Sequence, residues 1–161
     1  MKYISLLVIA CCCSLTGISQ DEGDRKSVEH AAQSWFNSFN NHNYDNMFDY
    51  MAEDCFGINP LGRYMIMSKE APVIFNKAHE TFLKNLSIKV DSINVRFTNR
   101  DAAVATVFSQ ERAARNQSGG IEQADNEVEG QGVITTMVIV RKDERWVIIQ
   151  YQSTHISKLM K

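Results

Sequence analysis

The spacing of apolar residues changes once along this sequence, from a helical period to an extended one. Between residues 27 and 40, apolar side chains such as Val28, Ala31 and Trp35 recur at intervals of three and four, which predicts an amphipathic helix. From residue 86 onward, β-branched and aromatic residues predict four strands, at residues 86–97, 102–111, 132–141 and 146–157. Helices followed by consecutive strands indicate an α+β fold.

Shorter elements are expected between the first helix and these strands. They are a second helix at residues 44–51, capped by Asn43, a hairpin of strands 54–58 and 64–67, and a third helix that begins at Ser68 or Glu70 and ends near Leu83. Pro72 is compatible with the third helix only because it lies in the first turn.

The N-terminus has the features of an export signal. Lys2 is followed by the apolar run YISLLVIACCC and then by small and polar residues, SLTGISQ. The apolar run is too short to span a bilayer. We therefore expect a signal peptide at residues 1–19, cleavage after Ser19, and an exported chain, periplasmic or secreted, that begins at Gln20. The alternative is a lipoprotein in which Cys11, at the end of a lipobox-like sequence, is lipidated and retained.

Composition limits the classes of function. Three of the four cysteines leave with the signal peptide, so only Cys55 remains and no intrachain disulfide can form. Its apolar context predicts a buried, unreactive thiol. A formal net charge of -2 without a basic block gives no indication of nucleic-acid binding, and no further membrane span is expected. Residues 20–161 are enough for a single domain.

Both faces of the predicted sheet are apolar. In residues 133–140 and 146–151, both alternation sets consist mostly of apolar side chains, a pattern typical of a sheet that is covered on two sides. The predicted helices cover only one face. We therefore expect the other face to pack against a second copy of the chain in a homodimer.

Four groups of residues follow one another in a recognisable order. They are Met51-Ala52-Glu53-Asp54 before CFGINPLG, Ser68-Lys69-Glu70, His79 with Phe82, and WVIIQYQST at residues 146–154. Together they resemble the SnoaL-like branch of the nuclear transport factor 2-like superfamily, including the SgcJ/EcaC family. The resemblance implies a cone-shaped, curved antiparallel sheet wrapped around three N-terminal helices, the nuclear transport factor 2-like or cystatin-like fold, with a pocket between helices and sheet. The branch is related to ketosteroid isomerases and also contains domains without known activity, so the fold alone does not choose a function.

The resemblance implies that the isomerase working groups are replaced here. In those enzymes an aspartate directly before Pro-x-Gly is the general base, whereas this sequence has Asn59 before Pro60 and Gly62. Trp35 lies at the position of the oxyanion-hole tyrosine, and the second oxyanion donor corresponds to a position near Thr136. An amide does not accept a proton near neutral pH, so isomerase activity is not expected from these positions.

The implied pocket is expected to bind a small, partly apolar molecule. Its apolar lining is expected to include Trp35, Phe39 and Phe75, and its polar groups to include Asn59, Tyr64, His79, Gln150 and Gln152. Gln152 resembles a recurrent Gln or His of the family's pocket. By strand alternation, both glutamines are expected to share a face with Trp146 and Ile148.

His79 is the candidate catalytic residue. On the third predicted helix it lies between Phe75 and Phe82, on or beside the inward stripe. A histidine with a near-neutral pKa suits acid-base chemistry, and Asp54 is the nearest candidate in sequence to orient its ring. The alternative is a structural histidine, bonded to a backbone carbonyl or reaching water at the flank of the helix.

Three functions remain open. The first is an exported, homodimeric small-molecule-binding domain, the second a cofactor-independent lyase, cyclase or isomerase that uses His79, and the third a non-catalytic protein-interaction module whose pocket is filled by its own side chains. No metal site is expected, because His30, His42 and His155 lack the spacing of ligands. No cofactor is expected either, because the sequence has no Gly-rich dinucleotide turn.

Overall fold

The computed structural model describes residues 22–113 and 131–156, so the predicted signal peptide and Cys11 lie outside the described residues. The helices are α1 (Glu22–Asn41), the 3-10 helix η1 (Met47–Asp49) and α2 (Ala71–Glu80). The strands are β1 (Met51–Ile58), β2 (Tyr64–Ile66), β3 (Leu86–Asn99), β4 (Ala102–Ala113), β5 (Gln131–Lys142) and β6 (Arg145–His155). The α+β class and the four long strands are as predicted.

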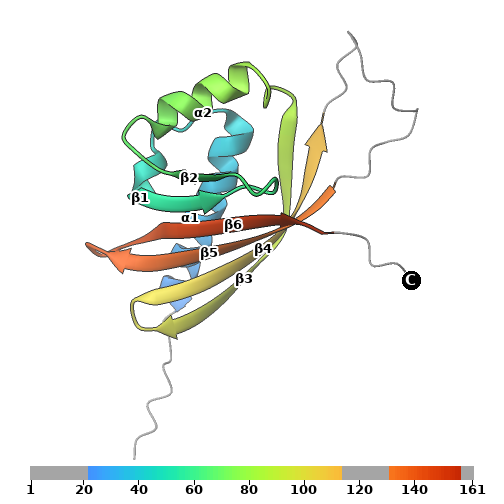
Figure 1. Ribbon diagram of the computed structural model, residues 1–161. Helices are drawn as coiled ribbons and strands as arrows, with labels where there is room; N and C mark the ends of the chain where they lie inside the picture. The colour runs from blue at the N-terminus through green and yellow to red at the C-terminus, as the bar shows by residue number, and fades with distance from the viewer. Residues whose placement is uncertain (1–21, 114–130, 157–161) are drawn as a thin grey trace, which may run out of the picture.

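All six strands form one curved sheet in the order β2-β1-β6-β5-β4-β3 (Figure 1). The prediction of an antiparallel sheet needs correction, because β1 and β6 run parallel whereas the other neighbouring pairs are antiparallel. The expected hairpin of β1 and β2 is present, with Phe56 opposite Ile66. Through β1, this hairpin extends the four-stranded meander into a mixed sheet.

The expected second helix at residues 44–51 is wrong, because a turn and the three residues of η1 take its place. The Asn43 side chain accepts a hydrogen bond from the backbone N–H of Asp45 at 3.0 Å, which closes a local turn instead of capping a helix. Further on, the carbonyl of Tyr50 accepts the N–H of Ile148 at 2.9 Å. Tyr50 and Met51 thus pair with β6, a strand far along the chain, and this pairing overrides the local helical pattern at the end of the expected helix.

The helix α1 confirms the amphipathic prediction and begins five residues earlier, at Glu22 rather than at Ser27. Its buried side chains are Val28, Ala31, Ala32, Trp35, Phe36 and Phe39. The helix lies against β3, β4, β5 and β6, and we call the sheet face turned towards it the inner face. On β4 this face carries Ala103 and Ala105, both fully buried, and such small side chains let a helix approach the sheet closely.

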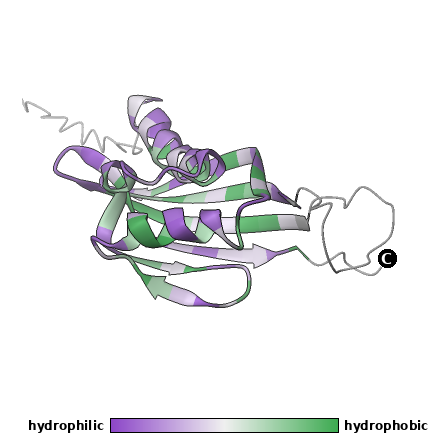
Figure 2. Cartoon of the chain, turned by 90° about the horizontal axis from the view of Figure 1, so that it is seen from above, coloured by the Kyte–Doolittle hydropathy of each residue, from purple (hydrophilic) through white to green (hydrophobic). Residues whose placement is uncertain are grey.

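Residues along the strands alternate between the two faces of the sheet, and Figure 2 shows the resulting bands of hydrophobic and hydrophilic residues. One row across the inner face consists of Gly57, Tyr151, Met137, Ala105 and Val95. Gly57 needs no side chain, because the Tyr151 ring covers it and an added Cβ would lie 2.6 Å from Tyr151 Oη. The outer face keeps large apolar side chains such as Phe108 and Ile149 partly exposed.

A bulge in β6 changes which of its residues face inward. Ile148 pairs with Ile139 on β5, and Gln150 pairs with the preceding residue, Val138, so Ile149 is an extra residue in β6. Gln150 and Gln152, which pairs with Thr136, therefore lie on the outer face. The expectation that both glutamines share a face with Trp146 and Ile148 is wrong, because simple alternation does not hold across a bulge.

The third predicted helix is present as α2, but it is shorter than expected and ends at Glu80. The backbone N–H of Leu83 donates to the Ala78 carbonyl at 3.0 Å, which closes the helix end. Phe82 lies beyond this end and is 80% exposed. It therefore does not flank His79 on an inward stripe, as the sequence pattern predicts.

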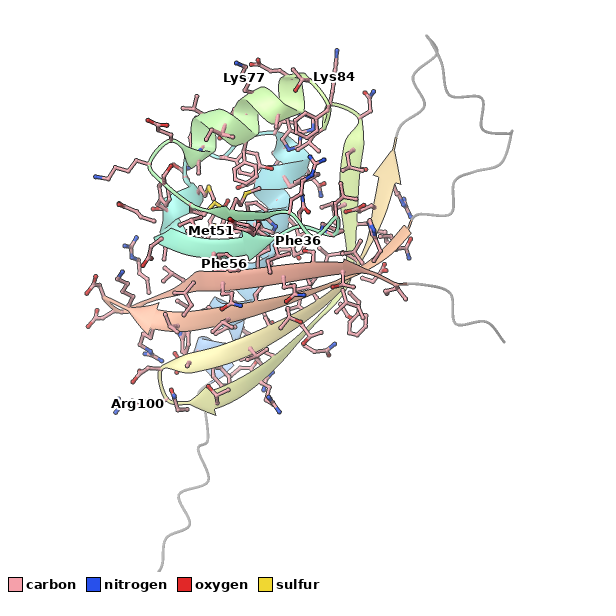
Figure 3. All side chains as sticks on the ribbon, viewed as in Figure 1. Phe36, Met51, Phe56, Lys77, Lys84 and Arg100 are labelled. Carbon is pink, nitrogen blue, oxygen red and sulfur yellow. The ribbon has the colours of Figure 1, made fainter. Side chains whose placement is uncertain are left out.

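The helix α2 packs through few side chains. It buries Ala71 and His79, whereas Val73 and Ile74 are more than half exposed. Figure 3 shows Lys77 pointing away from the helix into solvent. His79 is thus one of the two buried side chains of α2.

Candidate functional site

The side chains of Tyr44 and His79 form a buried hydrogen-bonded pair. The Tyr44 hydroxyl lies 2.9 Å from His79 Nε2, and the two residues are 0% and 3% exposed. Tyr44 belongs to the turn that replaces the second predicted helix, and His79 lies in the last turn of α2. Burial raises the pKa of Tyr44, so its hydroxyl stays protonated and can donate to His79 or accept from it.

Aromatic rings surround this pair. The Trp35 ring centroid lies 5.8 Å from that of Tyr44, 5.4 Å from that of Phe75 and 5.2 Å from that of Tyr151. Phe39 meets His79 edge-on at 4.6 Å. These contacts join α1 and α2 to the inner face of the sheet at β6. We call this group the aromatic cluster: Trp35, Phe39, Tyr44, Phe75 and Tyr151.

The second ring nitrogen of His79, Nδ1, has no hydrogen-bond partner among the residues that the structure describes. Burial lowers the pKa of His79, and a charge on His42 lowers it further. The backbone of Leu83 acts in the opposite direction, although it makes no hydrogen bond of standard geometry to Nδ1. The exposed ring of His42 stacks on His79 with its centroid 4.2 Å away. His79 is therefore a neutral histidine near pH 7 with one unused nitrogen beneath a surface residue.

Four of the eight predicted binding residues meet here: Trp35, Phe39, Phe75 and His79. The predicted partner of His79, Asp54, is exposed, and Tyr44 takes that role instead. Sequence reasoning missed Tyr44 and Tyr151. Tyr44 lies outside the helices and strands, so no periodic pattern points to it. Tyr151 faces inward only because of the bulge in β6, which leaves no local signal in an apolar segment.

Asn59 lies in the turn between β1 and β2, and its side chain holds that turn together. Its Oδ1 accepts hydrogen bonds from the backbone N–H groups of Leu61 and Arg63, each at 3.0 Å. The Asn59 carbonyl also accepts the N–H of Gly62 at 2.9 Å, and Gly62 has a φ of 75° that suits glycine. The amide oxygen is thus engaged locally, and contact between Asn59 and a ligand stays a prediction.

The other three predicted binding residues do not join the aromatic cluster. Tyr64 is 71% exposed, and its ring stacks on Phe56 with 5.9 Å between centroids. Gln150 and Gln152 are exposed, and Gln152 pairs with the exposed Thr136. Ligand contacts of these residues stay predictions.

A second polar group lies on the inner face, towards the end of β6. His155 Nε2 lies 3.2 Å from Glu111 Oε2, and the two side chains are 26% and 21% exposed. Two residues earlier on β6, Ser153 Oγ lies 2.9 Å from Thr135 Oγ1. The sequence predicts a surface or structural role for His155, because it lacks the spacing of a metal ligand. The contact with Glu111, 44 residues away, has no local signal in the sequence.

The Cys55 thiol has the features of an unreactive group. Cys55 is fully buried, and burial raises the pKa of its thiol to about 12, which leaves it protonated near neutral pH.

Within residues 22–113 and 131–156, no three His, Cys, Asp or Glu side chains are grouped so that they could hold a metal ion. None of the described helices is long and apolar enough to cross a membrane.

Comparison with known proteins places the fold. Residues 28–157 match the family model described as SnoaL-like domain. An uncharacterized protein with a cystatin-like fold from Caulobacter vibrioides has a TM-score of 0.68 at 15% identity, with 83% of this chain and 89% of that chain covered. A ketosteroid isomerase-like protein from Erwinia carotovora atroseptica has a TM-score of 0.62 at 12% identity, covering 86% and 100%.

An NTF2-like protein from Cytophaga hutchinsonii has a TM-score of 0.57 at 13% identity, with 82% of this chain and 98% of that chain covered. No curated protein matches the sequence. Identities this low show a shared fold alone, so the chemistry has to be argued from the side chains.

Proposed function

This chain belongs to the SnoaL-like domain family and has the cystatin-like fold of NTF2-like proteins, and from that premise we propose that it binds a small, partly apolar molecule at the aromatic cluster. The observation that carries the proposal is the buried, unpartnered Nδ1 of His79 among aromatic rings. Assignment to the SgcJ/EcaC branch stays a prediction.

An unpaired buried nitrogen is costly to the folded protein. A buried donor or acceptor without a partner costs roughly 1 to 3 kcal/mol, and His79 is 3% exposed. A ligand that hydrogen-bonds to Nδ1 removes this cost. The cost of the empty state thus supports a role for this nitrogen in binding.

The surroundings of His79 define the chemistry of the ligand. Trp35, Phe75 and Tyr151 supply apolar rings, while Nδ1 supplies one hydrogen-bonding group. This combination suits a compact ring compound that carries a carbonyl or hydroxyl group. His42 stacks on the His79 ring from the surface, so we propose that the ligand enters by displacing His42.

A second candidate function is acid-base catalysis by His79. The hydrogen bond between Tyr44 and His79 Nε2 fixes the orientation of the ring. When Nε2 carries the proton and donates to the Tyr44 hydroxyl, Nδ1 can accept a proton, and the lowered pKa keeps the ring neutral near pH 7. This arrangement suits a cofactor-independent lyase, cyclase or isomerase. For this candidate, replacement of His79 by alanine should abolish turnover of a substrate once one is found, and an unchanged rate would remove His79 from the mechanism.

A third candidate is a non-catalytic protein-interaction module. The rings of the aromatic cluster contact one another, with centroids 4.9 to 5.8 Å apart for the pairs of Trp35 and Tyr44 with their neighbours. Direct ring contacts of this kind favour an interior filled by its own side chains. A ligand site and an interior filled by its own side chains can be told apart, because only the ligand site responds at His79 to an added small molecule.

We also propose that the protein is exported and forms a homodimer through the outer face of the sheet. The apolar run near the N-terminus supports export. Phe108 and Ile149 on the outer face are 37% and 36% exposed, and Tyr64 and Ile66 on β2 are 71% and 67% exposed, which supports a covered surface. Sedimentation velocity at micromolar concentration should show a dimer that Phe108→Lys converts to a monomer. A wild-type monomer would contradict this part of the proposal.

Two probe molecules of similar shape test the binding proposal. Acetophenone carries a carbonyl on an aromatic ring, and ethylbenzene lacks the carbonyl. In NMR titrations of the full chain, acetophenone should shift the His79 ring signals and bind roughly fivefold more tightly than ethylbenzene, which corresponds to about 1 kcal/mol. His79→Leu should remove this difference. Absence of any acetophenone effect on His79 would favour the third candidate, a protein-interaction module whose interior is filled by its own side chains.

A further inference from the structure

A groove separate from the aromatic cluster lies along the polar face of α1. It has a volume of about 810 Å³ and is bounded by α1, by the segment from Asn43 to Tyr50 and by the β5–β6 turn at Glu144 and Arg145. None of the eight residues predicted to bind a ligand lines it. Its volume lies within the range of small-molecule sites.

Internal hydrogen bonds hold the large side chains at the floor of this groove. Ala31, Tyr50 and Trp146 line it and are buried. The Tyr50 hydroxyl donates to Ser38 Oγ at 2.7 Å, and Trp146 Nε1 donates to an Asp24 carboxylate oxygen at 3.1 Å. The groove therefore rests on side chains whose own hydrogen bonds are satisfied.

The walls, in contrast, carry unused hydrogen-bonding groups. The side chains of His30, Ser34, Asn41 and Asn46 line the groove and have no hydrogen bond or ion pair within the described part of the chain. An amide and a hydroxyl each offer both a donor and an acceptor. Such a set matches a ligand whose own groups also donate and accept.

The charges around the groove balance. Lys26 and Arg145 are opposed by Asp49 and Glu144, and Arg145 Nη1 lies 3.8 Å from Asp49 Oδ1. A phosphate or carboxylate would meet as many negative as positive groups here. The lining therefore favours an uncharged ligand.

From this lining we propose that the groove is a binding site for a neutral polyhydroxylated molecule, such as a monosaccharide, disaccharide or cyclic polyol. Each ligand hydroxyl both donates and accepts, as do the amides of Asn41 and Asn46 and the hydroxyl of Ser34. The site is independent of the proposed function at His79, because the two share no lining residue.

Titration of the ¹⁵N-labelled full chain with glucose, maltose and myo-inositol tests this proposal. At least one of the three should cause saturable shifts of the amides of groove-lining residues such as Lys26, Asn46 and Arg145, and none at Phe75 or His79, at concentrations up to about 50 mM. Inorganic phosphate should cause none in the groove. His79→Leu should leave the polyol response intact, so failure at one site does not decide the other.

Matched variants sharpen the test. His30 and Asn46 are exposed, so the double variant His30→Ala with Asn46→Ala should fold normally and weaken polyol binding at least about fivefold. Asn94→Ala, at an exposed position on β3, should bind as the wild type does. The proposal is overturned if no polyol shifts these amides, if phosphate binds there instead, or if the double variant binds like the wild type.

Discussion

The Tyr44 hydroxyl lies 2.9 Å from His79 Nε2, and this hydrogen bond links the turn after α1 to the last turn of α2. Because α2 buries only Ala71 and His79, the bond contributes to the attachment of the helix as well as to the orientation of the imidazole. The remaining nitrogen, Nδ1, has no hydrogen-bond partner among the described residues, and it is the atom to which we propose that a ligand binds. Stability and proposed binding therefore depend on the same pair of side chains.

Removal of the Tyr44 hydroxyl should destabilise the protein. Tyr44→Phe leaves His79 Nε2 buried without a partner, which should lower the free energy of unfolding by about 1 to 3 kcal/mol. Tyr64→Phe is the control, because Tyr64 is 71% exposed and the change should cost less than about 0.5 kcal/mol. Urea unfolding of both variants checks the difference, and equal costs would mean that the Tyr44–His79 bond contributes nothing.

Stability should fall at mildly acidic pH because of His79. Its folded-state pKa is lowered from 6.5, so between that lowered value and 6.5 the unfolded chain binds more protons than the folded chain. The free energy of unfolding should therefore decrease as pH falls through 6.5, until the folded-state pKa is passed. Urea unfolding at about pH 7.5 and about pH 5.5 measures this loss, and His79→Gln should reduce it. An identical loss in wild type and variant would rule out His79 as its source.

Asn59→Asp should preserve the turn without creating an isomerase. An aspartate can accept the same two backbone N–H groups, from Leu61 and Arg63, that Asn59 Oδ1 accepts. Those bonds favour the charged carboxylate and make it a weaker base. Asn59→Ala, by contrast, should cost about 1 to 2 kcal/mol. Ultraviolet absorbance can follow a β,γ-unsaturated ketosteroid, and measurable conversion by Asn59→Asp would show that residue 59 does reach a substrate.

A methyl group at Gly57 should disturb the aromatic cluster. An added Cβ would lie 2.6 Å from Tyr151 Oη, so Gly57→Ala should displace the Tyr151 ring and cost about 1 to 3 kcal/mol. Gly132→Ala is the control, because its Cβ would meet the movable end of Ile156 at 3.1 Å. Thermal unfolding compares the two. Similar small effects would indicate that Tyr151 moves aside easily.

Periodic patterns predicted most of this fold. The stripe of Val28, Ala31 and Trp35 identified α1 because helix burial follows a local period. The second helix was mispredicted because the partner of Tyr50 is Ile148, nearly a hundred residues away. No local pattern reports such pairing.

The candidate site was predicted only in part, because local patterns identify some of its residues and not others. Phe75 and His79 follow the stripe of α2, and the structure brings them to Trp35 and Phe39. Tyr151 escaped prediction because the bulge at Ile149 shifts its face. The segment around the bulge is apolar at nearly every position, so its alternation carries no information about which side chains point inward.

Native mass spectrometry tests the central claim, a small-molecule site at His79, most directly. The full chain and its His79→Leu and Asn94→Ala variants are produced in the organism of origin and measured under native and denaturing conditions. We predict that the wild type and Asn94→Ala, which changes an exposed residue of β3, retain a small molecule that denaturation releases, and that His79→Leu retains much less. A wild-type chain with the same bare polypeptide mass under both conditions would contradict the claim, as would a bound molecule retained equally by His79→Leu.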